Sequence, residues 1–150
     1  MLFRSLAAGV VVVGTPELLL DDAILGKAAA AGRAPFTFRG DSRAPEVIFK
    51  EGFSARGEST DLLAHALDNT NPPSAFISTS SSFSVASGFS DRVYVISAEG
   101  GINVNAALGS SSPFPYEFEV AIPGAIGPGD VRGVTLVSEG MSILNPNWQP

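Results

Sequence analysis

The chain is organised around the stretch Tyr116-Glu117-Phe118-Glu119-Val120. Because side chains of an extended strand alternate between its faces, a strand here predicts Glu117 and Glu119 on one face, opposite Phe118 and Val120. Two carboxylates on one face repel each other, and no basic residue adjoins them in sequence to relieve that repulsion. The pair indicates either a solvated edge strand, whose charges oppose aggregation, or two catalytic carboxylates with separate roles.

The composition is typical of one globular domain. The chain has 150 residues, 45% of them apolar and 16% charged, which suffices for a sizeable core and differs from a disordered composition. It has no Cys and one His, so a disulfide, a Cys-based zinc site and a multi-histidine metal site within the chain are excluded. The net charge of −6 disfavours binding to a phosphate backbone, which depends on Lys and Arg.

The N-terminal part, residues 1–33, differs from the rest of the chain. Its apolar run at 6–14 is shorter than the roughly 20 residues that a bilayer span needs. The run resembles a signal-peptide core, but no small-x-small cleavage site follows directly, and the residues after it predict a helix from Pro16 to about Ala31. We expect an apolar leader or fusion junction over 1–33, with a cleaved signal as the alternative, and a catalytic domain over 34–150.

From residue 34 the chain is rich in short elements, because Gly and Pro interrupt it often. Alternating or continuous apolar residues predict strands at 36–40, 75–78, 92–97, 116–120 and 131–137. Pro45 predicts the start of a short helix that ends before Gly52, and Ser59-Thr60-Asp61 predicts the cap of a second helix. Strands with helices grouped early indicate the α+β class.

Four stretches, in a fixed order, resemble the mono-ADP-ribosyltransferase toxins, specifically the cholera/heat-labile enterotoxin and pertussis toxin catalytic chains. Those chains carry an Arg followed by Asp-Ser-Arg-x-Pro, a single active-site His, a Ser-Thr-Ser strand and a Glu-x-Glu pair. The stretches here are 38–43 (Phe-Arg-Gly-Asp-Ser-Arg), 62–65 (Leu-Leu-Ala-His), 76–80 (Phe-Ile-Ser-Thr-Ser) and 113–120 (Pro-Phe-Pro-Tyr-Glu-Phe-Glu-Val). The similarity covers about residues 36–136.

The resemblance implies a fold and a substrate. We expect an ADP-ribosyltransferase-like fold of two small packed β-sheets with short helices and an NAD cleft between them. NAD would be the substrate, with no metal, and the reaction would break the bond between nicotinamide and ribose. Its transition state resembles an oxocarbenium ion, as in glycoside cleavage.

The resemblance also assigns roles to the acidic pair and to the arginine. Glu119 would stabilise the positive charge that develops on the ribose, and Glu117 would orient and deprotonate the acceptor. Arg39, with Gly40 beside it, would hold the diphosphate, for which a planar guanidinium is suited. A surface ion pair is the alternative for Arg39.

The remaining site residues are polar. By the resemblance, Ser78 would orient Glu119 from the neighbouring strand, while Thr79 and Ser80 support the pocket. His65 would belong to the NAD pocket; the alternative is a structural histidine, which is the commoner case for a lone His.

The resemblance predicts a toxin-type enzyme that transfers ADP-ribose to an arginine of a target protein. Relatives that modify guanine carry Gln at the first position of the pair, and Glu117 together with the acidic composition favours a protein acceptor over a nucleic acid. The alternatives are ADP-ribosylation of a nucleic acid, an NAD glycohydrolase and a non-catalytic binding module with an inherited fold.

The toxin class implies further expectations. The enzyme would be secreted or delivered into a target cell and act in its cytosol, without a membrane span. The chain resembles a bare catalytic module, because the regulatory tails and disulfide-linked segments of the longer cholera and pertussis chains have no counterpart here. An apolar leader ahead of a compact domain also resembles the tips of polymorphic bacterial toxins, which implies a cognate immunity protein as a partner.

Overall fold

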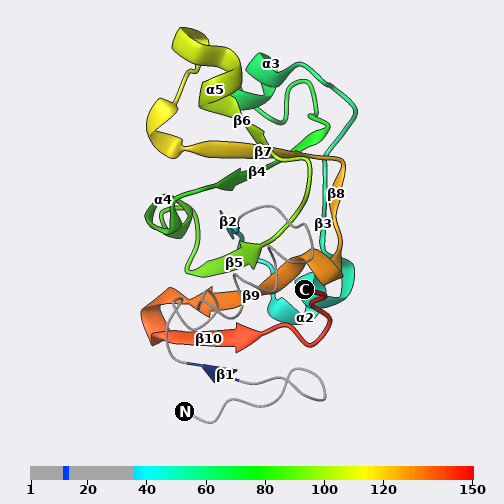
Figure 1. The fold of residues 1–150 in the computed structure, drawn as a ribbon, viewed down its shortest axis with the longest axis vertical. Helices are drawn as coiled ribbons and strands as arrows, with labels where there is room; N and C mark the ends of the chain where they lie inside the picture. Colours follow the sequence, from blue (N-terminus) through cyan, green and yellow to red (C-terminus); the bar gives the residue numbers. More distant parts are fainter. Residues whose placement is uncertain (1–11, 14–35) are drawn as a thin grey trace.

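The computed structural model describes residues 12–13 and 36–150, so the helix predicted at 16–31 and the rest of the expected leader lie outside the described residues. Within the described part, eight strands form one antiparallel sheet that runs along the long axis of the molecule (Figure 1). In spatial order they are β1 (Val12–Val13), β10 (Met141–Leu144), β9 (Val131–Leu136), β5 (Arg92–Ile96), β2 (Thr37–Gly40), β4 (Phe76–Ser80), β7 (Glu119–Pro123) and β6 (Ile102–Asn103).

The sheet divides into two halves between β2 and β4. β2 pairs with β5 along its whole length, from Thr37 opposite Ile96 to Gly40 opposite Val93. With β4 it shares only the pair Phe38 and Ser80, so the sheet opens at this junction. The α+β prediction is confirmed, while the two packed sheets expected from the sequence are two halves of one continuous sheet. A separate two-stranded sheet joins β3 (Phe53–Ser54) to β8 (Ala125–Ile126).

Four short helices accompany the sheet in the described residues: α2 (Pro45–Glu51), α3 (Leu62–Leu67), α4 (Phe83–Ser87) and α5 (Val104–Leu108). α2 begins with Pro in its first turn and ends at Gly52, whose φ of 69° suits glycine, as predicted. The predicted cap of α3 is Asp61, whose carboxylate accepts a hydrogen bond of 3.0 Å from the Ala64 amide.

Short 3₁₀ turns complete the connections: η2 (Gly109–Ser111), η3 (Pro115–Glu117), η4 (Pro128–Asp130) and η5 (Val137–Glu139). Among the described helices none is long and apolar enough to cross a bilayer.

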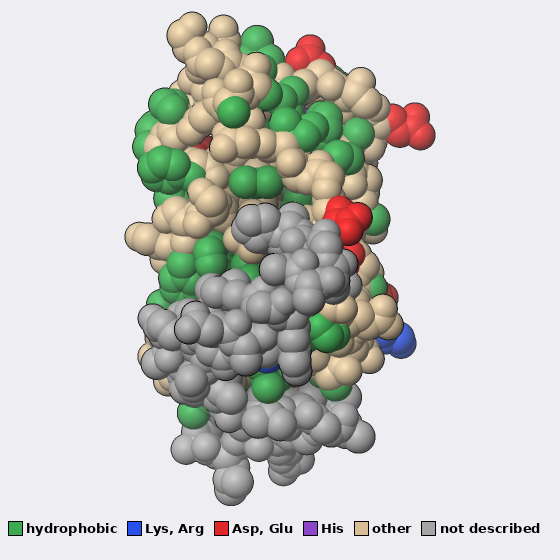
Figure 2. Space-filling view, viewed as in Figure 1, with side chains coloured by type: hydrophobic (Ala, Val, Ile, Leu, Met, Phe, Trp, Pro, Cys, Tyr) green, Lys and Arg blue, Asp and Glu red, His purple; other side chains and the backbone are tan. Residues whose placement is uncertain are grey.

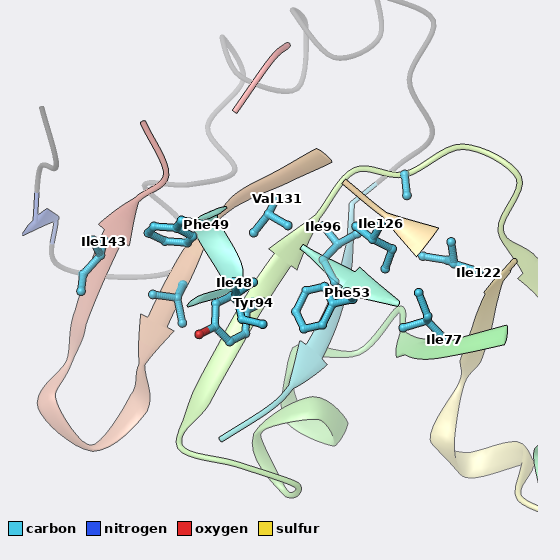
Figure 3. Packing of buried hydrophobic residues seen from close by; sticks show 12 residues of the cluster. Ile48, Phe49, Phe53, Ile77, Tyr94, Ile96, Ile122, Ile126, Val131 and Ile143 are labelled. Atoms are coloured by element: carbon cyan, nitrogen blue, oxygen red, sulfur yellow. The ribbon is translucent and has the colours of Figure 1, made fainter. Parts of the chain in front are cut away.

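Two hydrophobic clusters bury opposite faces of the central strands. On one face α2 places Ile48 and Phe49 against the sheet (Figure 3). The rings of Phe53 and Tyr94 pack edge to face there, with their centroids 5.5 Å apart. On the other face, α4 contributes Ala86 to a smaller cluster that includes Phe38. Because both faces of β5 are buried and Phe38 of β2 packs into the smaller cluster, β2 is held at the opening of the sheet, where its residues reach the candidate site.

Candidate active site

A cavity of about 360 Å³ lies where the sheet opens between β2 and β4, a size typical of small-molecule sites. Its walls come from β2, β4, the end of α3, α4 and the segment that precedes β7. The lining residues predicted from the sequence are Arg39, Gly40, His65, Ser78, Thr79, Ser80, Glu117 and Glu119. The structure thus brings all of the predicted site residues to one cavity, including Arg39 and Glu119 from the two halves of the sheet.

Glu119 is the first residue of β7 and is fixed by two hydrogen bonds. Ser78 Oγ, on the paired strand β4, donates to Glu119 Oε2 at 2.9 Å. His65 Nε2, on α3, lies 2.6 Å from the same oxygen. The Glu119 side chain retains only 14% of its exposure, while that of His65 is fully buried. Both of these hydrogen bonds end on Oε2, so Oε1 is the carboxylate oxygen that can meet a ligand.

Arg39 reaches the site from the other half of the sheet. Its Nη1 donates to the Ser78 carbonyl at 2.8 Å, and its Nε donates to Asp41 at 3.2 Å. Burial lowers the pKa of the Arg39 guanidinium and the Asp41 charge partly offsets this, but an arginine remains cationic under either influence. A fixed, largely buried cation beside a cavity is suited to an anionic ligand such as a diphosphate.

Asp41 supports this arginine and the turn that follows it. Arg43 donates to both Asp41 oxygens, at 2.9 and 2.7 Å. Burial raises the pKa of the Asp41 carboxyl, but the hydrogen bonds from Arg43 and the charge of Arg39 outweigh that effect and lower it to about 2. Asp41 is therefore ionised across the physiological range and holds Arg39 in place.

The prediction of one strand over 116–120 is wrong for its first half. Glu117 ends η3, Phe118 takes a left-handed conformation with φ of 48°, and the strand begins only at Glu119. Pro115 favours the turn, and Ser80 Oγ holds it by donating to the Glu117 carbonyl at 2.7 Å. The two carboxylates therefore approach one cavity through this turn and not through strand alternation.

Glu117 nevertheless lies close enough to Glu119 for the two carboxylates to interact electrostatically. Partial burial, and then the negative charge of Glu119, raise the pKa of the Glu117 carboxyl. A carboxylate with a raised pKa is a better proton acceptor near neutral pH, so the pair has the unequal environments that acid-base chemistry uses.

The other predicted residues shape the cavity. Gly40 packs against α4 so closely that a Cβ there would collide with the Ala86 carbonyl, which explains the glycine. Thr79 is buried and donates to the Val120 carbonyl at 2.7 Å, so it ties β4 to β7. No cluster of three or more potential metal ligands occurs among the described residues.

Three residues that support or line the cavity were not predicted from the sequence. Ser74 lies in the loop before β4 and contacts His65 Nδ1 at 2.6 Å. Phe89 follows α4 and lines the cavity with most of its side chain exposed. Asn105, on α5, donates to the Pro115 carbonyl at 2.8 Å and so anchors the segment that carries Glu117. The Asn-Pro-Pro-Ser loop and the five-residue helices α4 and α5 give no periodic signal that would have marked these residues.

Comparison with known proteins identifies the family of this chain. The family described as Scabin-like matches residues 37–148. A guanine-specific ADP-ribosyl transferase of Streptomyces coelicolor is 35% identical over 128 residues, which cover 75% of this chain and 60% of that protein. Pierisin of Pieris brassicae is 32% identical over 130 residues, which cover 73% of this chain and 15% of pierisin. The chain thus spans less than two thirds of either relative.

Solved structures of similar proteins superpose on this chain. A guanine-specific ADP-ribosyltransferase superposes with a TM-score of 0.68 at 31% identity, covering 77% of this chain and 79% of the other. The Scabin toxin from Streptomyces scabies in complex with NADH superposes with a TM-score of 0.67 at 29% identity, covering 77% and 76%. The predicted ADP-ribosyltransferase fold is confirmed, and this chain belongs to the Scabin-like family of ADP-ribosyltransferase toxins.

Proposed function

We propose that this chain transfers ADP-ribose from NAD to a guanine base and releases nicotinamide. The observation that carries the proposal is Glu119, fixed by His65 and Ser78 at a cavity whose opposite wall supplies the cation Arg39. A buried cation matches the diphosphate of NAD, and an oriented carboxylate matches the positive charge that develops on the ribose next to it. The NADH complex of the Scabin toxin supports NAD as the ligand.

The chemical step follows from these groups. The bond between nicotinamide nitrogen and the ribose anomeric carbon breaks, and its electron pair leaves with nicotinamide. Glu119 stabilises the positive charge left on the ribose, and a nitrogen of the acceptor then bonds to that carbon. The acceptor loses a proton, and Glu117, whose pKa is raised, is the base placed to take it.

The choice of guanine rests on the relatives. A curated relative and a solved structure are named as guanine-specific ADP-ribosyltransferases, and these names do not support the arginine acceptor that the sequence predicted. The acidity of the chain remains relevant: in Figure 2, Asp and Glu are more prominent than Lys and Arg on the visible face. Long-range attraction to a nucleic-acid backbone is weak on such a surface, so recognition of the acceptor depends on the base.

Transfer to a protein arginine is the second candidate, and Glu117 is the observation that favours it. A guanidinium is protonated in water and needs a neighbouring base before it can attack, and Glu117 is a carboxylate at the cavity with a raised pKa. Guanine needs less help from a base, because its nitrogens are neutral at physiological pH.

This proposal includes the roles given above for the site residues and a domain boundary near residue 34. It also includes action inside a target cell, with an immunity protein as a partner. The toxin names of the relatives support the last point.

The experiment incubates the purified chain with labelled NAD and, in separate reactions, guanosine, adenosine, agmatine as an arginine mimic, or no acceptor. Nicotinamide release and the ADP-ribosylated products are measured by chromatography and mass spectrometry. The proposal expects a guanosine adduct and faster nicotinamide release with guanosine. Labelled agmatine without a guanosine adduct would favour the arginine candidate, and free ADP-ribose as the sole product under every condition would indicate a glycohydrolase.

A further inference from the structure

The imidazole of His65 is bonded on both sides. Its Nε2 meets Glu119 Oε2 at 2.6 Å, and its Nδ1 meets the Ser74 hydroxyl at 2.6 Å. Ser74 is almost fully buried, at 1% exposure, and it does not line the cavity. We propose that Ser74 is a positioning residue: it holds His65 as the neutral tautomer protonated on Nε2, so that His65 donates a hydrogen bond to an ionised Glu119. The catalytic part of this inference rests on the proposed function.

The hydrogen-bond partners of Ser74 allow its hydroxyl to donate to His65. The Phe76 amide donates to Ser74 Oγ at 2.9 Å, so this oxygen already accepts one hydrogen bond. The hydroxyl proton can go to His65 Nδ1 at 2.6 Å or to the Phe76 carbonyl at 3.4 Å. The much shorter contact is favoured, since a hydrogen bond weakens with distance. Donation from Ser74 to Nδ1 requires that nitrogen to be unprotonated, so that the proton of a neutral His65 is on Nε2. The reverse bond, from a protonated Nδ1 to Ser74 with the hydroxyl donating to the Phe76 carbonyl, is opposed by the contact of Nε2 with Glu119.

Contacts at the other ring nitrogen fit the same tautomer. A proton on Nε2 points toward Glu119 Oε2, with Ser78 Oγ 3.0 Å from the same nitrogen. Ser78 itself donates to Glu119 at 2.9 Å. The opposite tautomer would place an unprotonated Nε2 against Glu119 at 2.6 Å, and that contact would need a proton on the carboxyl group.

The tautomer therefore matters for the charge of the catalytic group. With Nε2 protonated, Glu119 receives two hydrogen bonds on Oε2 and keeps its negative charge, while Oε1 stays available to the ribose. With Nδ1 as the only protonated nitrogen, Glu119 must carry the proton and loses the charge that stabilises the transition state. The other charged groups at this cavity are Glu117, Arg39 and Asp68. The ring of Phe76 packs edge to face with the imidazole, with the two ring centroids 5.4 Å apart, and so fixes the imidazole plane.

The first test reads the tautomer directly and needs no activity. His65 is the one histidine of the chain, so nitrogen-15 labelling of histidine gives an imidazole spectrum with a single assignment. A long-range proton–nitrogen correlation spectrum of the unliganded protein at about pH 8, above the ordinary histidine pKa of about 6.5, distinguishes the three protonation states. The proposal expects a protonated Nε2 and an unprotonated Nδ1. A protonated Nδ1, alone or together with a protonated Nε2, would overturn it.

The second test uses nicotinamide release by the full chain. Ser74→Ala removes the donor to Nδ1, and we expect turnover to fall about tenfold, the scale of one weakened hydrogen bond to a charged group. The KM for NAD should change much less, because Ser74 does not line the cavity. Ser74→Thr keeps the hydroxyl and should restore most of the turnover and the wild-type tautomer.

Ser142→Ala is the matched control. Ser142 is also fully buried and also shares a hydroxyl hydrogen bond, with Thr135 at 2.9 Å, but it lies in β10, away from the cavity. Its loss should leave turnover unchanged. Equal losses in Ser74→Ala and Ser142→Ala, or a raised KM at unchanged turnover in Ser74→Ala, would contradict a positioning role. A wild-type chain that releases no nicotinamide would refute the proposed function, while the tautomer measurement would still decide the state of His65.

Discussion

Replacing Glu119 by Gln separates the charge of this side chain from its shape. The amide is nearly isosteric, and its oxygen can still accept from His65 and Ser78, as Oε2 does now at 2.6 and 2.9 Å. What is lost is the negative charge that Oε1 presents to the cavity. Removing one preorganised electrostatic group of this kind costs about 10²–10³ in turnover, or roughly 2.7–4 kcal/mol of transition-state stabilisation. We therefore expect nicotinamide release and ADP-ribose transfer to fall together by that factor.

The same substitution should have a small effect on folding. Two hydrogen bonds to a charged acceptor become bonds to a neutral one, which costs about 1 kcal/mol. In a chain of this size that lowers Tm by roughly 2–4 °C. The assays are steady-state nicotinamide release and thermal unfolding of the variant beside the wild type. Near-wild-type hydrolysis of NAD by a folded Glu119→Gln variant would refute the role assigned to this carboxylate.

Three further predictions follow from other contacts of the site. Glu117→Gln should reduce transfer to an acceptor more than hydrolysis of NAD, because Glu117 is the base for the acceptor in the proposed mechanism; equal losses measured in parallel assays would place it in NAD cleavage itself. Asn105→Asp loses the donor to the Pro115 carbonyl, so it should loosen the segment before β7 and lower the ratio of transfer to hydrolysis severalfold, and an unchanged ratio would contradict this. Asp41, whose pKa is about 2 in the folded state against 3.8 ordinarily, stabilises the fold above about pH 4 and loses that contribution as pH falls toward 2; denaturant unfolding should show a smaller loss over this range in Asp41→Asn.

Local chemistry made much of the fold predictable from the sequence. Pro45 and Gly52 bound α2, Asp61 caps α3, and the apolar residues of β5 form a strand buried on both faces. The site residues were predictable for another reason: the order of the motifs resembles a known family, whose chemistry requires an arginine, a serine and two carboxylates together. The structure brings these residues to one cavity although they are far apart in the chain.

What the sequence did not indicate depends on contacts between distant segments. The turn that carries Glu117 competes with a strand of good local propensity, and Pro115 together with the Ser80 hydrogen bond decides in favour of the turn. β10 and the helices α4 and α5 are too short for a periodic pattern. The role of Ser74 exists only because its loop packs behind His65. The motif residues favoured an arginine acceptor, whereas the proposed guanine acceptor is supported by the names of the relatives.

The most direct test of the proposed function is a competition between acceptors in one reaction. Guanosine and agmatine at equal concentration are incubated with NAD and the wild-type chain, and mass spectrometry quantifies the two ADP-ribosylated products. Glu119→Gln serves as the control for uncatalysed reaction. The proposed function predicts a guanosine adduct in large excess over the agmatine adduct, and neither product above background with the variant. An excess of modified agmatine, or a guanosine adduct formed equally well by Glu119→Gln, would contradict it.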